Sequence, residues 1–316
     1  MIADIEDRVA IRRLHGVDMR MLRHRPLKAW LALATLMGGL VMLSDFASAQ
    51  VQGVEVEGSL DLGAKARQVM IDIFLHKDAA TIERSFTGSF VQHDPIIADG
   101  LPGLKSFAAE VARSPAAKIT IYRTLIDGDM VMLHSKYEGL RGVAAPLIAF
   151  DLFRFKDGKI VEHWGGQDSE TAPNLSGHTQ VDGPAAVVDR EKTESNRALV
   201  RDFKQIVTVE LHFDRVGEFI EGDNYTQHAS NIGDGTARLR ARVSEVAKPG
   251  VVPVLQPRRY VADGNFVLAL VEARTEPHPT ANYDLFRVEN GKIVEHWDVL
   301  SPIPPRAQWK NSNGPF

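Results

Sequence analysis

The feature that most constrains the fold of this chain is an internal duplication. The segment DLFRFKDGKIVEHW at residues 151–164 returns as DLFRVENGKIVEHW at residues 284–297, with only three differences. Upstream, FVQHDPIIADG at residues 90–100 matches YTQHASNIGDG at residues 225–235. The distance between the matching segments is nearly the same in both cases. The repeat therefore indicates two copies of a whole domain and not one short motif used twice.

Residues 1–49 have the pattern of an export signal and are set apart from both copies. Several basic residues precede the apolar run AWLALATLMGGLVML at Ala29–Leu43, and ASA follows at Ala47–Ala49. The apolar run is shorter than the roughly 18 residues that span a bilayer. We predict a signal peptide cleaved after Ala49 and an exported protein, periplasmic or secreted. An uncleaved membrane anchor is the alternative.

The duplication and the composition of the connecting segment give the domain boundaries. We predict a first domain at residues 50–169, a linker at 170–189 that is rich in Pro, Gly, Ser and Thr, and a second domain at 190–316. Each domain is long enough to bury a core of its own.

Within each copy, helical patterns precede strand patterns. Apolar residues at helical spacing occupy the stretches 66–74 and 104–111 of the first copy and 199–207 of the second. Short β-branched and aromatic runs separated by DGD and KDG turns then predict an antiparallel meander. The expected class is α+β, with helices covering one face of a curved antiparallel sheet.

These motifs together carry a resemblance to a known family. With QH before a DG turn, and DLFR…GKIVEHW at the end, each copy resembles the SnoaL-like branch of the NTF2-like superfamily, which includes polyketide cyclases. The resemblance implies two cone-shaped α+β domains, each with a pocket between sheet and helices. It also implies a choice between catalysis, ligand binding and dimerisation, because the fold supports all three.

Composition excludes several other classes of function. The chain has no cysteine, which excludes disulfides, thiolate metal sites and a thiol nucleophile. A net charge of −4 with interspersed signs leaves no basic face for nucleic acid. No HExxH motif, G-x-S-x-G motif or glycine-rich phosphate loop is present. We therefore expect no metal and no cofactor, and a small hydrophobic molecule or a second copy of the domain as the partner.

The most suggestive acidic residues are Asp151 and its counterpart Asp284, each within a strongly apolar strand. A buried carboxylate must find hydrogen-bond donors or have a raised pKa, and a raised pKa suits a general base. The alternative is an Asp that a neighbouring donor holds for structural reasons only. The two copies also differ, since Asp298 closes the EHWD pattern in the second and Gly165 stands there in the first.

Histidines supply the acid partner in this hypothesis. His93 and His228 follow a Gln where the pattern predicts that a helix gives way to a loop, and His134 is present in the first copy only. Each could polarise a substrate oxygen or simply orient the Asp. The predicted catalytic residues are Asp151, His93, His134, Asp284, His228 and Asp298.

A second set of residues is expected to line the pockets. Alternation places Glu162 with Trp164 on one face of a strand and His163 on the other, but the sequence does not decide which face meets the pocket. Glu162 and Glu295 are expected to pair with Arg154 and Arg287. The predicted substrate-binding residues are Phe90, His163, Trp164, Tyr225, His296 and Trp297.

Two functional hypotheses follow. The first is cofactor-free acid/base catalysis on a hydrophobic carbonyl compound, of the aldol, cyclisation or isomerisation type. The second is a non-catalytic module that binds a small molecule or dimerises. The sequence does not say which copy is active.

Overall fold

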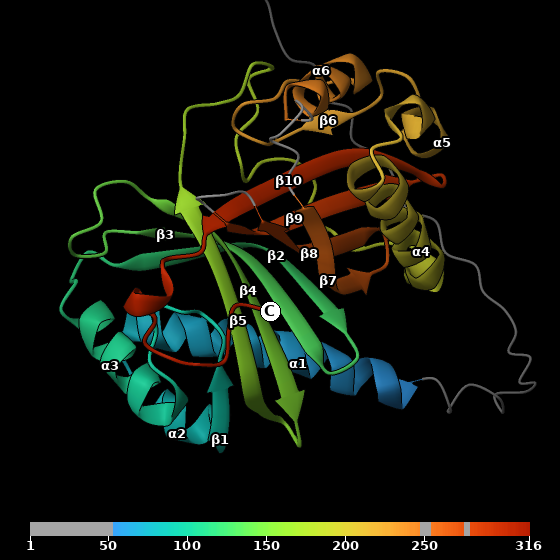
Figure 1. Cartoon of the computed structure of the whole chain (residues 1–316). Helices are drawn as coiled ribbons and strands as arrows, with labels where there is room; N and C mark the ends of the chain where they lie inside the picture. The colour runs from blue at the N-terminus through green and yellow to red at the C-terminus, as the bar shows by residue number, and fades with distance from the viewer. Residues whose placement is uncertain (1–52, 247–253, 275–278) are drawn as a thin grey trace, which may run out of the picture. The chain divides into compact units, whose positions relative to one another are not determined.

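The computed structural model describes residues 53–246, 254–274 and 279–316, with the backbone alone for residues 53–61 and 242–246. The predicted export signal at 1–49 lies outside these residues. All described residues belong to one compact unit (Figure 1). Among them, no helix combines the length and the apolar character that crossing a membrane requires.

The first half is a five-stranded sheet with helices against it. Its strand order is β1-β5-β4-β3-β2, and β1 is parallel to β5 while the other neighbours are antiparallel. Its elements are α1 (Gly53–Ile71), the π-helical turn η1 (Asp72–His76), α2 (Thr81–Ser85), β1 (Phe86–Gln92), α3 (Gly100–Ala112), β2 (Lys118–Asp127), β3 (Met130–Glu138), β4 (Leu147–Lys156) and β5 (Lys159–Ser169).

The second half repeats this topology in a sheet of order β6-β10-β9-β8-β7, again with a parallel pair at one edge. Its elements are η2 (Arg190–Lys192), α4 (Thr193–Phe203), η3 (Lys204–Val209), η4 (Phe213–Arg215), α5 (Val216–Phe219), β6 (Thr226–Gln227), α6 (Thr236–Val246), β7 (Val254–Asp263), β8 (Phe266–Arg274), β9 (Thr280–Glu289), β10 (Lys292–Pro302) and η5 (Arg306–Gln308).

The predicted α+β class and the antiparallel meander are confirmed in both halves. One local expectation was wrong. The QH motifs do not follow a helix but the strands β1 and β6, which join the sheet parallel to β5 and β10. A two-residue β6 and a seven-residue β1 are too short and irregular for their alternation to stand out in the sequence.

Turn residues set the register of the strands that carry the repeat. The two-residue turns between β4 and β5 and between β9 and β10 are Asp157-Gly158 and Asn290-Gly291. All four residues have positive φ, from 51° to 75°. This is the backbone of a type I′ hairpin, which Asp-Gly and Asn-Gly adopt readily and which matches the twist of paired strands.

Each sheet buries both of its faces. The helices of each half cover one face, as Figure 1 shows for α1 and α3 on the first sheet and α4 on the second. The opposite faces form a third core that contains residues of both sheets, among them Phe150 and Trp164 of the first and Phe266 and Trp297 of the second. Strand alternation therefore assigns each side chain either to the helix side or to the other sheet.

Candidate functional site

Asp151 lies on the face of β4 that the helices cover. Its neighbours Phe150 and Leu152 point to the core shared with the second sheet, while Ala149 and Phe153 belong to the core under the helices. Asp151 is only 5% exposed. A carboxylate so placed needs donors from the surrounding elements, because an unpaired buried charge is costly.

Those donors form a chain of four side chains. Nε2 of His163 on β5 lies 3.1 Å from Oδ1 of Asp151, and the hydroxyl of Tyr137 on β3 donates to Oδ2. On the other side of the imidazole, Nδ1 of His163 lies 2.9 Å from Oε1 of Gln92 at the end of β1. Four separate strands thus position one buried acid/base network.

The contacts decide where the hydrogens of His163 lie. Oε1 of Gln92 also accepts the backbone N–H of Asp94 at 2.9 Å, so the atom facing Nδ1 is an acceptor and Nδ1 carries a hydrogen. Nε2 then faces a carboxyl oxygen. This contact is favourable when one proton lies between His163 and Asp151, carried by either of them. Asp151 and His163 therefore form a hydrogen-bonded carboxyl–imidazole pair.

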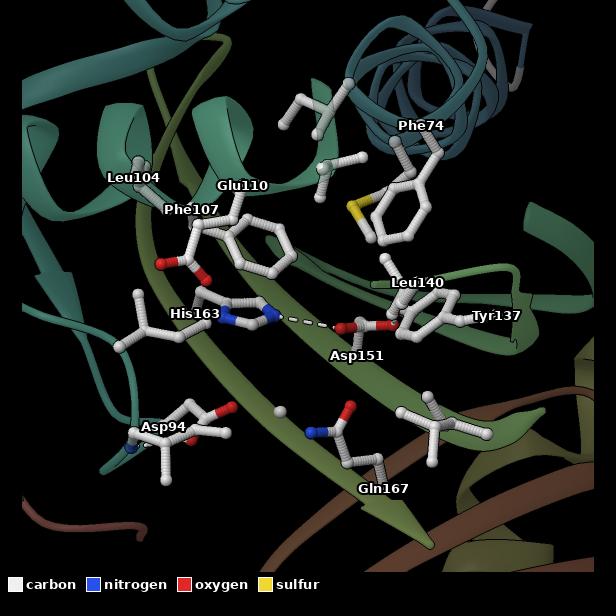
Figure 2. Close-up of a pocket in the computed structure, with 18 of the residues that line it drawn as sticks. Phe74, Asp94, Leu104, Phe107, Glu110, Tyr137, Leu140, Asp151, His163 and Gln167 are labelled. Carbon is white, nitrogen blue, oxygen red and sulfur yellow. Dashed lines mark hydrogen bonds and ion pairs between the residues drawn. The ribbon is translucent and has the colours of Figure 1, made fainter. Parts of the chain in front are cut away.

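The pair lines a cavity of about 270 Å³ between the sheet and the helices (Figure 2). Apolar side chains from the helices make one wall: Met70, Ile73, Phe74, Leu104, Phe107 and Val111. Polar side chains gather on the strand side: Gln92, Asp94, Tyr137, Asp151, His163 and Gln167. An apolar pocket with a few convergent polar groups is the usual form of a site for a small molecule.

The second half builds the same network with one change. Nε2 of His296 lies 3.2 Å from Oδ1 of Asp284, and Nδ1 of His296 lies 2.8 Å from Oε1 of Gln227. Oδ2 of Asp284 accepts from the ammonium of Lys204 at 2.8 Å, where Asp151 has the phenol of Tyr137. Burial alone would raise the pKa of Asp284, but Lys204 and His296 together hold it well below its usual range.

Asp298 lies beside this second network. It is directly opposite Asp284 in the register of β10 and β9, whereas Gly165 is opposite Asp151 in the first half. Burial raises the pKa of Asp298 to about 6, with His296 opposing the shift and Asp284 adding to it. Two carboxylates face each other here, and the ammonium of Lys204 balances one of them.

Comparison with known protein families gives a match in the half that contains the first network. Residues 68–163, from α1 to His163 itself, match the family of SnoaL-like domains. This stretch of the first half is therefore a SnoaL-like domain by its sequence. The second half repeats its motifs and its strand order, so the predicted tandem arrangement is supported by two sheets of the same topology.

Solved structures resemble single halves of the chain. A proposed polyketide cyclase from Bacillus cereus is 24% identical, over 34% of this chain and 74% of that one, with a TM-score of 0.31. An NTF2-like protein of unknown function from Burkholderia xenovorans is 21% identical, over 40% of this chain and all of that one, with a TM-score of 0.32. A proposed ketosteroid isomerase from Kribbella flavida is 20% identical, over 36% and 87%, with a TM-score of 0.30. No curated protein matches the chain.

Three of the predicted catalytic histidines lie away from the cavity of the first SnoaL-like domain and from its counterpart. His93 and His228 stack on Trp164 and Trp297, each with ring centroids 4.5 Å apart, on the faces where the sheets meet. His134 is fully buried against Phe150 on the same side. Burial lowers the pKa of His93, and burial with Arg123 beside it holds the pKa of His134 well below its usual range.

The predicted substrate-binding residues divide in the same way. His163 and His296 belong to the two networks, while Trp164 and Trp297 lie in the core between the sheets. Phe90 is buried under the helices against Phe86. Tyr225 is buried near the second network, and burial followed by the charge of Asp284 raises its pKa.

The expected cross-strand ion pairs form in both halves. Nε of Arg154 lies 2.7 Å from Glu162, and Nε of Arg287 lies 2.6 Å from Glu295.

Sequence reasoning missed four residues of the two networks, Gln92, Gln227, Tyr137 and Lys204, and also Asp94 in the first cavity. A signal for Gln92 was present, since Gln is kept before His in both copies. Tyr137 and Lys204 had none, because each occurs in one copy only and lies far from its Asp in the chain.

Within the described part of the chain, two groups of side chains have the composition of a metal site. They are His178, Asp182 and His228, and Asp284, His296 and Asp298. In the second group Lys204 already provides a positive charge 2.8 Å from Asp284, which disfavours a cation there. In the group of His178, Asp182 and His228, Oδ1 of Asp182 already accepts a hydrogen bond from Nδ1 of His228 at 2.6 Å, so that nitrogen is not a free ligand.

Proposed function

We propose that the first SnoaL-like domain is a cofactor-free acid/base catalyst that moves a proton next to a carbonyl group in a small, largely apolar compound. One observation carries the proposal: Asp151 and His163, 3.1 Å apart, line a largely apolar cavity of about 270 Å³. Proton transfer beside a carbonyl is the step common to isomerisation, cyclisation and aldol chemistry, and it needs positioned acid and base groups such as this carboxylate and imidazole.

The comparison of the halves supports assigning this role to the first. The ammonium of Lys204 stabilises the ionised form of Asp284, which lowers its basicity. Asp151 has the neutral phenol of Tyr137 in the corresponding contact and no ammonium there.

The test is hydrogen–deuterium exchange at carbon. The purified protein is incubated in deuterated water with 2-tetralone and ethyl benzoylacetate, and deuterium uptake is followed by NMR. We expect Asp151→Asn to lower uptake about 100-fold or more, and Asp284→Asn, the matched substitution in the other half, to leave it unchanged. Uptake that neither substitution affects, or no uptake above the buffer rate, would refute the proposal.

Binding without turnover is the second candidate function, and the pairing of Asp151 favours it. Both carboxyl oxygens already accept hydrogen bonds, from His163 and Tyr137, which restrains the group. 2-Naphthol, a stable analogue of the enol of 2-tetralone, separates the two functions. Saturable binding of 2-naphthol with no exchange on either ketone would indicate a binding module.

We also propose export of the protein, on the basis of the leader-like residues 1–49. The measurement is the N-terminal mass of the protein recovered from the cell that produces it. A chain that begins at Gln50 supports export and cleavage, and an intact Met1 in the cytoplasmic fraction contradicts them.

A further inference from the structure

The two halves differ by a reciprocal exchange of one acidic residue. In the QH motif, Asp94 of the first half is matched by Ala229 of the second. In the HW motif, Gly165 of the first half is matched by Asp298 of the second. Besides Asp151 or Asp284, each half therefore has one further acid near its His. In the first half this acid follows β1, and in the second half it lies on β10.

The structure places the two acids in equivalent surroundings. A Cβ atom built on Gly165 would lie 3.5 Å from Oδ2 of Asp94 and 3.1 Å from Cε1 of His163. The carboxylate of Asp94 thus lies against the space that a side chain at position 165 would fill. In the second half, the carboxylate of Asp298 occupies that space and lies within 4.8 Å of the ligand atoms of His296 and Asp284.

Of the two aspartates that line the first cavity, Asp94 is the more available. Its Oδ1 accepts the backbone N–H of Ile96 at 3.0 Å, and among the described residues no hydrogen-bond donor reaches Oδ2. Asp151 has both oxygens occupied. Figure 2 shows the carboxyl group of Asp94 on the same side of the cavity as His163 and Gln167. Burial raises the pKa of Asp94, as a base toward carbon requires.

A donor for the substrate oxygen is present in the same cavity. Gln92 is fully buried and lines the cavity, and its Nε2 has no hydrogen-bond partner among the described residues. A buried amide N–H without an acceptor is costly, and a carbonyl oxygen of a ligand would satisfy it.

We infer that Asp94 is a catalytic base of the first SnoaL-like domain and replaces the acid missing at Gly165. This rests on the proposed function. The carboxylate takes the α proton of the bound ketone; the C–H electron pair forms the carbon–carbon double bond of the enolate, and its oxygen accepts a hydrogen bond from Gln92. Asp94 then returns a proton, exchanged with solvent, to the same carbon, and the pair Asp151–His163 supplies and removes the proton at oxygen.

The experiment moves the acid from one position to the other. We expect Asp94→Asn to lower the exchange of 2-tetralone about 100-fold, because the amide keeps the contact with Ile96 but is no base. Asp94→Ala should be as inactive, and Asp94→Ala with Gly165→Asp should recover exchange at least about tenfold. Gly165 has no positive φ, so the new Asp adopts an ordinary backbone. Ala229→Asp in the second half is the matched control and should leave the exchange of 2-tetralone unchanged.

Binding of 2-naphthol shows that each variant keeps a folded cavity. Retained binding with lost exchange, restored by the transfer of the acid to position 165, supports the inference. Exchange that survives Asp94→Asn while Asp151→Asn abolishes it overturns the role of Asp94 and leaves the proposed function standing. Absence of exchange in the unsubstituted protein overturns both.

Discussion

At the scale of single residues, two neighbouring carboxylates of the second half have pKa values shifted in opposite directions. Asp284 and Asp298 face each other across β9 and β10, yet the pKa of one is lowered and that of the other is raised. The difference arises from the partners: Lys204 contacts Asp284 directly, whereas for Asp298 burial outweighs the more distant charges of His296 and Lys204. The pKa of an aspartate in this site therefore depends on its neighbours and cannot be inferred from the residue type.

These shifts predict opposite effects on stability. The pKa of Asp298 is about 6 when folded, above the roughly 3.9 of an unfolded Asp. Its ionisation therefore costs stability as pH rises through this window. We expect Asp298→Asn to stabilise the protein by about 1–2 kcal/mol at pH 7.5, with the gain disappearing near pH 4. Urea unfolding at several pH values measures it, and a less stable variant at pH 7.5 would contradict the assignment.

Asp284→Asn is the matched comparison and should act in the other direction. The pKa of Asp284 is lowered, so its contribution is present above the unfolded pKa and is lost as pH falls through the folded one. Removing the carboxylate leaves the buried ammonium of Lys204 without its counter-charge at neutral pH. We expect a loss of about 3 kcal/mol at pH 7.5 by the same urea measurement.

At the scale of elements, the strand that carries His163 also carries a close contact with the other half. A Cβ built on Gly166 of β5 would lie 2.1 Å from the ring of Tyr283 on β9. Gly166 has no positive φ, so the glycine is required by this approach and not by its backbone. The first half therefore depends on a glycine that the counterpart position, Val299, does not need.

Gly166→Ala should accordingly destabilise the protein by about 2 kcal/mol, because the ring of Tyr283 must shift within a packed core. Gly88→Ala is the control, since Gly88 is also in a strand and nothing lies within 4 Å of its added Cβ. We expect that variant to stay within about 0.5 kcal/mol of the unsubstituted protein. Equal losses of stability for the two substitutions would show that the close approach of Tyr283 does not require a glycine at position 166.

The segments that follow each sheet repeat as well. Asn174 and Asn311 begin the motifs NLSG and NSNG, whose glycines have φ of 87° and 83°. The side-chain amide of Asn174 donates to the carbonyl of Gln227, and that of Asn311 donates to the carbonyl of Asp94 at 2.6 Å. The segment after each sheet thus holds the QH loop of the other half.

At the scale of the whole molecule, the described halves interact through reciprocal contacts. Asp127 accepts the backbone N–H of Ala262 at 3.1 Å, and the equivalent Asp263 accepts that of Ile126 at 3.0 Å. The guanidinium of Arg123 lies 4.1 Å from the ring centre of Trp297, and that of Arg259 lies at the same distance from Trp164. Such reciprocity is the signature of a two-fold interface, here between two copies in one chain.

This interface explains the placement of the histidines that sequence reasoning put in the pockets. His93 was predicted to be catalytic, but its ring stacks on Trp164, against which Arg259 of the other half also lies. In an isolated domain that face would be open to solvent. The second copy converts it into a core, and the cavity lies on the helix-covered face.

The sequence by itself determined the duplication, the α+β class, the meander strands and the placement of Asp151 and Asp284 within apolar strands, because repeats, alternation and turn residues are local properties of the chain. The sequence also contained the exchange of Asp94 and Gly165 for Ala229 and Asp298, but it did not show that the two acids lie in corresponding places beside the His. Only the tertiary structure decided which face of each strand lines the cavity, since both faces are buried and both are apolar in pattern. It alone joined Gln92, Tyr137, Asp151 and His163, because convergence of four strands depends on β1 pairing with β5, which no local pattern encodes.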